Sequence, residues 1–392
     1  MPSPLAMICN GTQNATSPAI VAVEASSLII FMVGAALANS VAICITLRTP
    51  SLRSHAHNLL ILNLNVADLG ISLFTMPFSL ASVFDRGCFL SSQGAACKAN
   101  GFLTLLFTIV VPMSILAICV ERFLAVVLSQ RFPPSKRRVF VFIAFSWSSS
   151  LLLGLMPLTG ATSMYHYHAS TFHCSPSWDD PLFRVFGMFT LVVLTPGLIL
   201  FYIAIVFYLR KVGLRLKRTR RAAVNGDDRP TGLSNSAIQR QSNVPAEAAE
   251  SDANDPSSIS REHTTGAYSM ASKKANDDES TTKRKKRKVS RQHSFSAQIK
   301  QWKVETRVAA VGAVLVMALI FCWMPYMLVH LGFIAVGEGH WFGVTTMWLA
   351  FANSLLDPMI YTFMDRRARA QLKKYVRRGR NSFRAKTTWR PS

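Results

Sequence analysis

An aspartate and a proline lie next to each other, as Asp357 and Pro358, inside the last long apolar stretch of the chain. An ionisable side chain in hydrocarbon is costly and marks a functional site by default. A proline at that depth frees backbone groups that neighbouring helices or buried water must satisfy. A second aspartate, Asp68, lies in an earlier apolar stretch. Such residues are expected where a helix bends around something polar, which favours a switch.

A second charged group is the pair Glu121 and Arg122, which follows Cys97 by 24 and 25 residues. At 1.5 Å per helical residue, Arg122 lies about 37 Å from Cys97, one membrane plus part of its headgroup layers. Glu305 precedes Pro325 by 20 residues. That separation is about 30 Å along a helix and predicts that Glu305 lies at the depth of Arg122.

Seven segments that are long and apolar enough to cross roughly 30 Å of hydrocarbon must position these residues. They lie near 20–47, 57–84, 100–128, 138–158, 182–210, 306–334 and 343–364. Only 16% of the residues are charged, and 43 Lys and Arg oppose 20 Asp and Glu. The basic residues gather between alternate segments, which puts the C-terminus in the cytoplasm and the N-terminus outside the plasma membrane. This placement argues against a nucleic-acid partner.

The outer side carries the glycosylation acceptors Asn10 and Asn14, each in an Asn-x-Thr sequon. Met1 to Val23 contain no positively charged leader, so we expect no cleaved signal peptide. Four cysteines fall on this oxidising side and allow three pairings: Cys9, Cys88, Cys97 and Cys174.

Composition divides the chain into five parts. These are an N-terminal tail (1–19), five spans (20–210), a basic third cytoplasmic loop (211–303), two spans (304–364) and a basic tail (365–392). The loop has almost no large apolar residues, so we expect it to be disordered. Its basic run, 283–288, favours anionic lipids of the inner leaflet over a nuclear localisation signal. Residues 365–376 form a predicted amphipathic helix in the plane of that leaflet.

Several span residues occur in an order that resembles a known family. They are Asn39, Leu64-Asn65-Val66-Ala67-Asp68, Glu121-Arg122-Phe123, Trp147, Pro196, Cys322-Trp323-Met324-Pro325-Tyr326, and Asn353-Ser354-Leu355-Leu356-Asp357-Pro358-Met359-Ile360-Tyr361. Together they resemble the rhodopsin-like (class A) G-protein-coupled receptors. The resemblance implies an all-α seven-helix bundle without enzymatic activity. It also implies an extracellular ligand and a heterotrimeric G protein, arrestin and receptor kinases as cytoplasmic partners.

The resemblance assigns roles to these residues. Cys97 and Cys174 resemble the family's disulfide, which leaves Cys9 and Cys88 for a second bridge. Arg122 with Glu121 and Glu305 resembles the family's ionic latch, a two-state element whose alternative is a solvated surface pair. The activation switch further includes Trp323, Pro325, Asp357, Pro358 and Tyr361.

A buried polar site is implied at Asn39, Asp68, Asn353, Ser354 and Asp357, where the family commonly holds Na⁺. Two carboxylates in one dry site cannot both ionise cheaply, so one carries a proton or a cation lies between them. Val111 stands where the family often supplies a Ser ligand, so a protonated Asp bonded to Asn remains open. Pro112, Leu319 and Ala204 also depart from the family pattern, and Tyr202 is expected to face away from Arg122.

The implied ligand pocket consists of Thr104, Phe107, Tyr326, His330, Trp348 and Phe351. Thr104 replaces the Asp of amine receptors, and 343–364 lacks the Lys that opsins need for retinal. The apolar, aromatic lining suits a lipid or another hydrophobic molecule. Arg184 is a candidate partner for a carboxylate, and His166, His168 and His173 are a weak candidate for Zn²⁺; no firm metal site is predicted.

Short motifs narrow the resemblance to a subgroup. Asn58-Leu59-Leu60-Ile61-Leu62-Asn63-Leu64, Arg131-Phe132-Pro133 and Arg380-Asn381-Ser382-Phe383-Arg384 are similar to the group containing the trapped-in-endoderm, moody and medium-chain fatty acid receptors. That resemblance implies a role in cell migration or barrier formation. A ligand-independent constitutive receptor or scaffold of the same fold is the main alternative. A zinc amide hydrolase lacks convergent in-span histidines, and a transporter lacks an inverted repeat.

Overall fold

The computed structural model describes residues 17–224, 271–334, 340–365 and 368–377. These residues form two compact units, Met1–Tyr208 with Glu305–Ser392, and Leu209–Val304. The first unit is a helical bundle, and the second consists of two helical segments.

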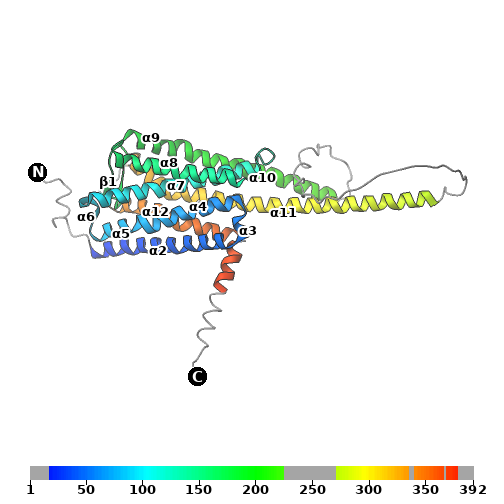
Figure 1. Cartoon of the computed structure of the whole chain (residues 1–392), viewed down its shortest axis with the longest axis horizontal. Coiled ribbons are helices and arrows are strands. Elements are labelled where there is room, and N and C mark those ends of the chain that lie inside the picture. The colour runs from blue at the N-terminus through cyan, green and yellow to red at the C-terminus, as the bar shows by residue number, and fades with distance from the viewer. Residues whose placement is uncertain (1–16, 225–270, 335–339, 366–367, 378–392) are drawn as a thin grey trace, which may run out of the picture. The chain divides into compact units, whose positions relative to one another are not determined.

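The bundle is built from long apolar helices. The first four spans are α2 (Pro18–Arg48), α4 (Ala56–Gly70) continued by η1 (Ile71–Thr75) and α5 (Met76–Phe84), α7 (Gly94–Val126) and α8 (Lys136–Thr159). The others are α9 (Pro181–Phe189) continued by η2 (Thr190–Leu194) and α10 (Thr195–Val224), α11 (Ala271–His330) and α12 (His340–Met364). Figure 1 shows α2, α4, α7 and α12 lying along one another.

Within the described residues, six helical stretches are long and apolar enough to cross a membrane. The helix α12 is not among these six, because it carries Asn353, Ser354 and Asp357 among its apolar residues. It packs against α2 and α4 as a further helix of the same bundle. Polar residues that face a bundle interior lower the mean hydropathy of a span without preventing it from crossing.

Proline explains the two π-helical turns. Pro77 follows η1 and Pro196 follows η2. A proline ring collides with the carbonyl four residues earlier, and one extra residue in the turn relieves that collision. At η2 the hydroxyl of Thr195 donates to the carbonyl of Thr190 at 2.9 Å. By contrast, α7 continues through Pro112 without interruption.

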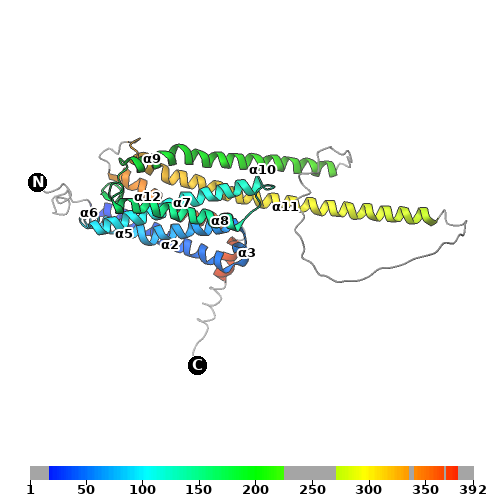
Figure 2. The same cartoon turned by 45° about the horizontal axis from the view of Figure 1, so that its top comes forward.

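Short elements close the two ends of the bundle. At one end lie α6 (Cys88–Ser92) and an antiparallel pair, β1 (His166–His168) and β2 (His173–Ser175), in which Tyr167 faces Cys174. At the other end lies α3 (Pro50–Arg53). Both views separate α6 from α3 by the length of the bundle (Figures 1 and 2).

The expectation of disorder over 211–303 differs from the structure at both ends of that segment. Residues 211–224 continue α10, and 271–303 belong to α11. Lys, Arg, Glu and Ala favour helix, so a span can extend past the membrane without apolar residues. In this second unit, Trp302 Nε1 donates to the carbonyl of Leu209 at 3.0 Å. Residues 225–270 lie outside the described part of the chain.

The predicted amphipathic helix is helical over its described residues from 368 onward, and 366–367 lie outside the described part of the chain. Residues 368–377 are helical. The carboxylate of Asp365 accepts a hydrogen bond from the Ala368 amide at 3.1 Å, as a helix N-cap does. Ala368 is buried. A short helix therefore follows α12.

Candidate functional site

A buried polar cluster joins α2, α4 and α12 at Asn39, Asp68, Asn353, Ser354 and Asp357. Asn39 Nδ2 donates to the carbonyls of Ser354 at 2.8 Å and Ala35 at 2.9 Å. Asn353 Nδ2 donates to Asp357 Oδ2 at 2.9 Å. All five residues are at most 1% exposed. The structure thus brings together the polar site residues expected from the sequence.

This polar cluster lacks a protein cation. The ion pairs found in the described residues include neither Asp68 nor Asp357. Asp68 lies close to Ser354 and Asp357, but no hydrogen bond of normal length and angle reaches either Asp68 oxygen, Oδ1 of Asp357 or Oγ of Ser354 within the described residues. Buried acceptors without partners are costly. A proton, water or a small cation would supply what these oxygens lack.

A group of ion pairs joins the end of α7 to the start of α8 and to α11. Arg122 Nη2 donates to Glu121 Oε2 at 2.7 Å, and Arg122 Nη1 reaches Glu305 Oε2 at 3.4 Å. Glu121 Oε1 also accepts from Arg138 Nη2 at 3.1 Å. Arg138 was counted only as a cytoplasmic charge in the sequence. Arg138 lies in the first turn of α8, and this position is what could have indicated from the sequence that its side chain reaches α7.

The side chain of Glu305 is 29% exposed, whereas that of Glu121 is fully buried. The Arg122–Glu121 pair is therefore an internal feature of α7, and the longer Arg122–Glu305 contact is the one that joins α7 to α11. Trp323, Pro325, Pro358 and Tyr361 lie further along α11 and α12, and Tyr361 is 1% exposed.

A hydrogen-bond chain that sequence reasoning missed ties α4, α7 and α8 together. Trp147 Nε1 donates to Asn63 Oδ1 at 2.8 Å, and Asn63 Nδ2 donates to Ser114 Oγ at 2.8 Å. Asn63 and Ser114 are polar residues within apolar spans, which is the signal that could have identified them.

At the outer end, the disulfide between Cys97 and Cys174 fixes β2 to α7, as the resemblance implied. The Cys174 amide donates to Asn100 Oδ1 at 2.7 Å, and Tyr165 Oη donates to the Gly154 carbonyl at 2.7 Å. The loop is thereby held against the bundle. Cys9, Asn10 and Asn14 lie outside the described residues, so the Cys9–Cys88 bridge and the glycosylation sites stay predictions.

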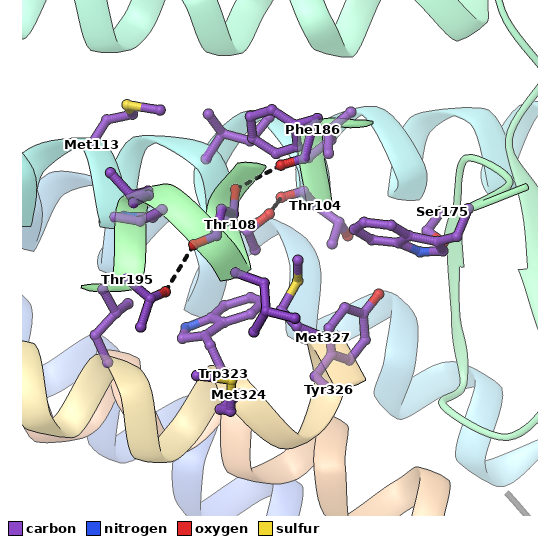
Figure 3. Close-up of a pocket in the computed structure, with 18 of the residues that line it drawn as sticks. Thr104, Thr108, Met113, Ser175, Phe186, Thr195, Trp323, Met324, Tyr326 and Met327 are labelled. Carbon is purple, nitrogen blue, oxygen red and sulfur yellow. Dashed lines mark hydrogen bonds between the residues drawn. The ribbon is translucent and has the colours of Figure 1, made fainter. Parts of the chain in front are cut away.

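A cavity lies between α7, the η2 region and α11, under β2 (Figure 3). Of the expected ligand residues, Thr104 and Tyr326 line it. His330 stacks on Tyr326 with ring centroids 4.1 Å apart. The cavity also has lining residues that were not expected, such as Trp178, Phe186 and Met327.

Three expected ligand residues lie elsewhere. Phe107 fills the space above Gly70 and packs edge-on against Trp147. Trp348 faces α2, where its Nε1 donates to Ser27 Oγ at 3.0 Å, and Phe351 packs on Trp348. Gly70 has no side chain to exclude the Phe107 ring, so that ring turns away from the cavity. Phe107, Trp348 and Phe351 therefore do not line this cavity, and their part in a ligand pocket stays a prediction.

Histidines from the outer loop lie above the cavity. His173 Nε2 lies 3.0 Å from Tyr326 Oη, and His168 Nε2 lies 2.8 Å from Ser175 Oγ. Burial, followed by the neighbouring His330 and His166, lowers the pKa of His168 to about 3. Burial also lowers the pKa of His173 well below its usual value. These loop imidazoles are neutral, and the described residues contain no group of three ligands placed to hold a metal ion.

Tyr202 departs from its expected orientation. It is 6% exposed, and it lies on the buried face that α10 forms with Leu198, Ile205 and Leu209. Its hydroxyl occupies the space beside Gly312 of α11. Arg184, by contrast, pairs with Asp179 at 2.7 Å on the surface, with 57% of its side chain exposed.

Comparison with known proteins identifies the family. The model of the 7 transmembrane receptor (rhodopsin family) matches residues 38–361. A blue-sensitive opsin of Carassius auratus is 31% identical over 37% of this chain and 41% of its own. A neuropeptide F receptor of Drosophila melanogaster is 32% identical over 32% of this chain and 25% of its own. A high-affinity lysophosphatidic acid receptor of Xenopus laevis is 30% identical over 34% of this chain and 35% of its own.

The matched region thus spans less than half the length of these curated relatives. The crystal structure of squid rhodopsin superimposes with a TM-score of 0.63 and 18% identity, over 92% of this chain and 87% of that one. That likeness shows the fold, while the family match covers most of the bundle. The chain therefore belongs to the rhodopsin family of seven-transmembrane receptors, a family of multi-pass membrane receptors and not of enzymes.

Proposed function

We propose that this chain is a plasma-membrane receptor that binds an extracellular hydrophobic ligand and activates a heterotrimeric G protein. The contact between Arg122 and Glu305 carries the proposal, because it closes the cytoplasmic ends of α7 and α11 onto each other. A single weak ion pair between two helices is an element with two accessible arrangements. Its opening would expose the buried face of α7 to a cytoplasmic partner.

The ligand site is the cavity between α7, the η2 region and α11. Thr104 offers no charge to an amine, and α12 contains no Lys for a retinal Schiff base. A lipid or another hydrophobic small molecule fits such a lining. The subgroup resemblance supports a role in cell migration or barrier formation.

Na⁺ is the proposed allosteric ion of the buried polar cluster. Asp68, Ser354 and Asp357 present carboxylate and hydroxyl oxygens that no hydrogen bond of normal length and angle reaches within the described residues, and hard cations prefer oxygen ligands. Val111 contributes no oxygen from α7. A protonated aspartate in place of the ion is the competing occupant.

The distribution of basic residues supports an orientation in the membrane and a set of partners on the cytoplasmic side. The basic ends of α10 and α11 support a cytoplasmic location for that side and an extracellular N-terminus. Arrestin and receptor kinases are the further partners proposed on the cytoplasmic side. The basic segments favour anionic lipids of the inner leaflet.

The test is second-messenger output in cells that express the wild-type chain, Arg122→Ala or Glu305→Ala, without ligand and against a panel of lipids. We expect Glu305→Ala to raise basal output and Arg122→Ala to abolish the ligand response. A basal output that Glu305→Ala leaves unchanged would contradict the latch. High basal output without response to any lipid would favour the ligand-independent receptor. Silence with every G protein would favour a scaffold.

A further inference from the structure

The cavity has no charged side chain in its lining. None of the lining residues, all within the described chain, carries a carboxylate, amine, guanidinium or imidazole group. Arg184 is occupied by Asp179 on the surface. His168 and His173 above the cavity are neutral, because burial lowers their pKa values. A charged ligand group would therefore lose its hydration without gaining a counter-charge.

Most hydroxyl groups of the lining already have partners. Thr108 Oγ1 donates to the Thr104 carbonyl at 2.6 Å, and Thr190 Oγ1 donates to the Phe186 carbonyl at 2.9 Å. Tyr326 Oη contacts His173 at 3.0 Å. The Thr108 and Thr190 hydroxyls have no proton left to donate to a ligand, because each already donates to a carbonyl of the protein.

Thr104 and Trp323 differ from these residues. The Oγ1 atom of Thr104 and the Nε1 atom of Trp323 are buried and have no partner within the described residues. Thr104 is 7% exposed and lines the cavity, as Trp323 does. A buried donor without a partner is costly unless a ligand or water satisfies it. The two groups therefore call for an uncharged ligand with oxygen acceptors.

The cavity continues inward beyond Trp323. Its lining includes Pro112 of α7, Leu198 of α10 and Leu319 of α11. Pro112 lies eight residues along α7 from Thr104, which corresponds to about 12 Å of helix. Leu319 lies one turn deeper than Trp323. The side chains named at this deep end are apolar, and the hydroxyl of the neighbouring Thr195 is bonded to the Thr190 carbonyl, so the deep end can accept the end of a hydrocarbon chain.

We propose that the cavity binds an uncharged single-chain amphiphile, with its oxygens at Thr104 and Trp323 and its chain ending against Pro112, Leu198 and Leu319. The inference rests on the proposed function in one respect, because it assumes that this cavity is the ligand site. It specifies that the ligand has no charge and that Leu319 sets the length of its chain.

The experiment measures ligand-induced thermal stabilisation of the full-length receptor in lipid nanodiscs. The probes are 1-monoacylglycerols and fatty acids of equal chain length, from about six to about sixteen carbons, at about pH 9, where the acids are ionised even though a bilayer surface raises the pKa of their carboxyl groups. We expect the monoacylglycerols to act at concentrations at least about tenfold lower than the acids, because the acid must be desolvated without a partner.

Two substitutions at the deep end of the cavity test whether Leu319 sets the preferred length of the ligand's hydrocarbon chain. Leu319→Phe should shorten the preferred chain by about two or three carbons, and Leu319→Ala should lengthen it, because each buried methylene changes affinity about fourfold. Thr104→Val should weaken monoacylglycerol binding about fivefold to tenfold at every length. The matched control is Phe321→Ala, because Phe321 lies on the same helix and is 67% exposed.

The outcomes separate the two proposals. Equal or tighter binding of the acids, no binding of monoacylglycerols, or the same preferred length in both Leu319 variants would overturn the ligand inference. The expected binding pattern without G-protein activation in cells would uphold the ligand inference and contradict the proposed function.

Discussion

The ion pairs around Arg122 and the buried polar cluster are both rich in carboxylates, but their carboxylates have different partners. Glu121 and Glu305 lie within 2.7–3.4 Å of an arginine. Asp68 and Asp357 have no arginine or lysine partner in the described structure, and Asn353 gives Asp357 one amide hydrogen bond. The charge is balanced by protein at the first site and must be balanced from solution at the second. The two sites should therefore respond to different perturbations, the first to mutation of a partner and the second to ions and protons.

The largest effect is expected from Arg122→Ala, which removes the cation that two glutamates share. Glu121 is fully buried and would keep only Arg138, at 3.1 Å. Removing one member of a buried pair costs about 3–5 kcal/mol. Thermal inactivation of the purified receptor should show the loss, whereas Arg138→Ala should cost less. Equal stability of Arg122→Ala and wild type would refute the buried pairing.

Asp357→Asn should leave folding intact and change basal signalling together with its dependence on Na⁺ and pH. The amide needs no external proton or cation, and Asn353 can bond to it. Basal output is measured with Na⁺ replaced by choline, in the variant and in Asp68→Asn. Signalling that does not change would mean that Asp357 only helps to bend α12.

Glu305→Gln should raise basal output about twofold to fivefold, since a partly exposed ion pair contributes about 0.2–1 kcal/mol. The side chain is 29% exposed and the contact is 3.4 Å long. Lys303→Ala, which removes a charge from the same helix, is the control. A rise of the same size in Lys303→Ala would attribute the effect to charge in general rather than to the latch.

The smallest expected effect is a loss of stability in the loop that holds His168 as the pH falls. The loop adds a third case to the comparison, in which the buried titratable group is a base. Folding lowers the pKa of His168 from 6.5 to about 3, so the unfolded loop binds protons first. Stability is complete above about pH 6.5 and falls as the pH drops toward 3. The hydrogen-exchange rate of 166–175, divided by the intrinsic rate at the same pH, should therefore rise modestly near about pH 5.5. His168→Gln should reduce that rise, and an unchanged rise would exclude His168 as its source.

Sequence reasoning was most effective along the membrane normal. Because each helical residue advances by a fixed rise, counting residues put Glu305 at the depth of Arg122, and the two side chains lie 3.4 Å apart. The family and the Cys97–Cys174 disulfide are confirmed. The spans differ from their predicted limits by a few residues, apart from helical extensions at α7, α10 and α11.

Rotation about the helix axes was harder to predict. With 3.6 residues per turn, consecutive side chains point in directions about 100° apart. An error of one residue in register therefore predicts contact with the wrong neighbouring helix. The π-helical turn at Thr190–Leu194 adds such a change just before α10, where Tyr202 faces inward against expectation. For Phe107 the deciding factor is the absence of a side chain at Gly70, and for Trp348 it is a hydroxyl on Ser27.

The close fit of Tyr202 against Gly312 has a consequence for the divergence of related chains. The phenol hydroxyl occupies the volume that a β-carbon at position 312 would need. Any lineage that acquires a side chain at 312 must first reduce the residue at 202 or displace α10 from α11. Substitutions at the two positions should therefore be inherited as pairs, and this pairing should separate receptors with this helix contact from those in which a different residue of α10 approaches Arg122.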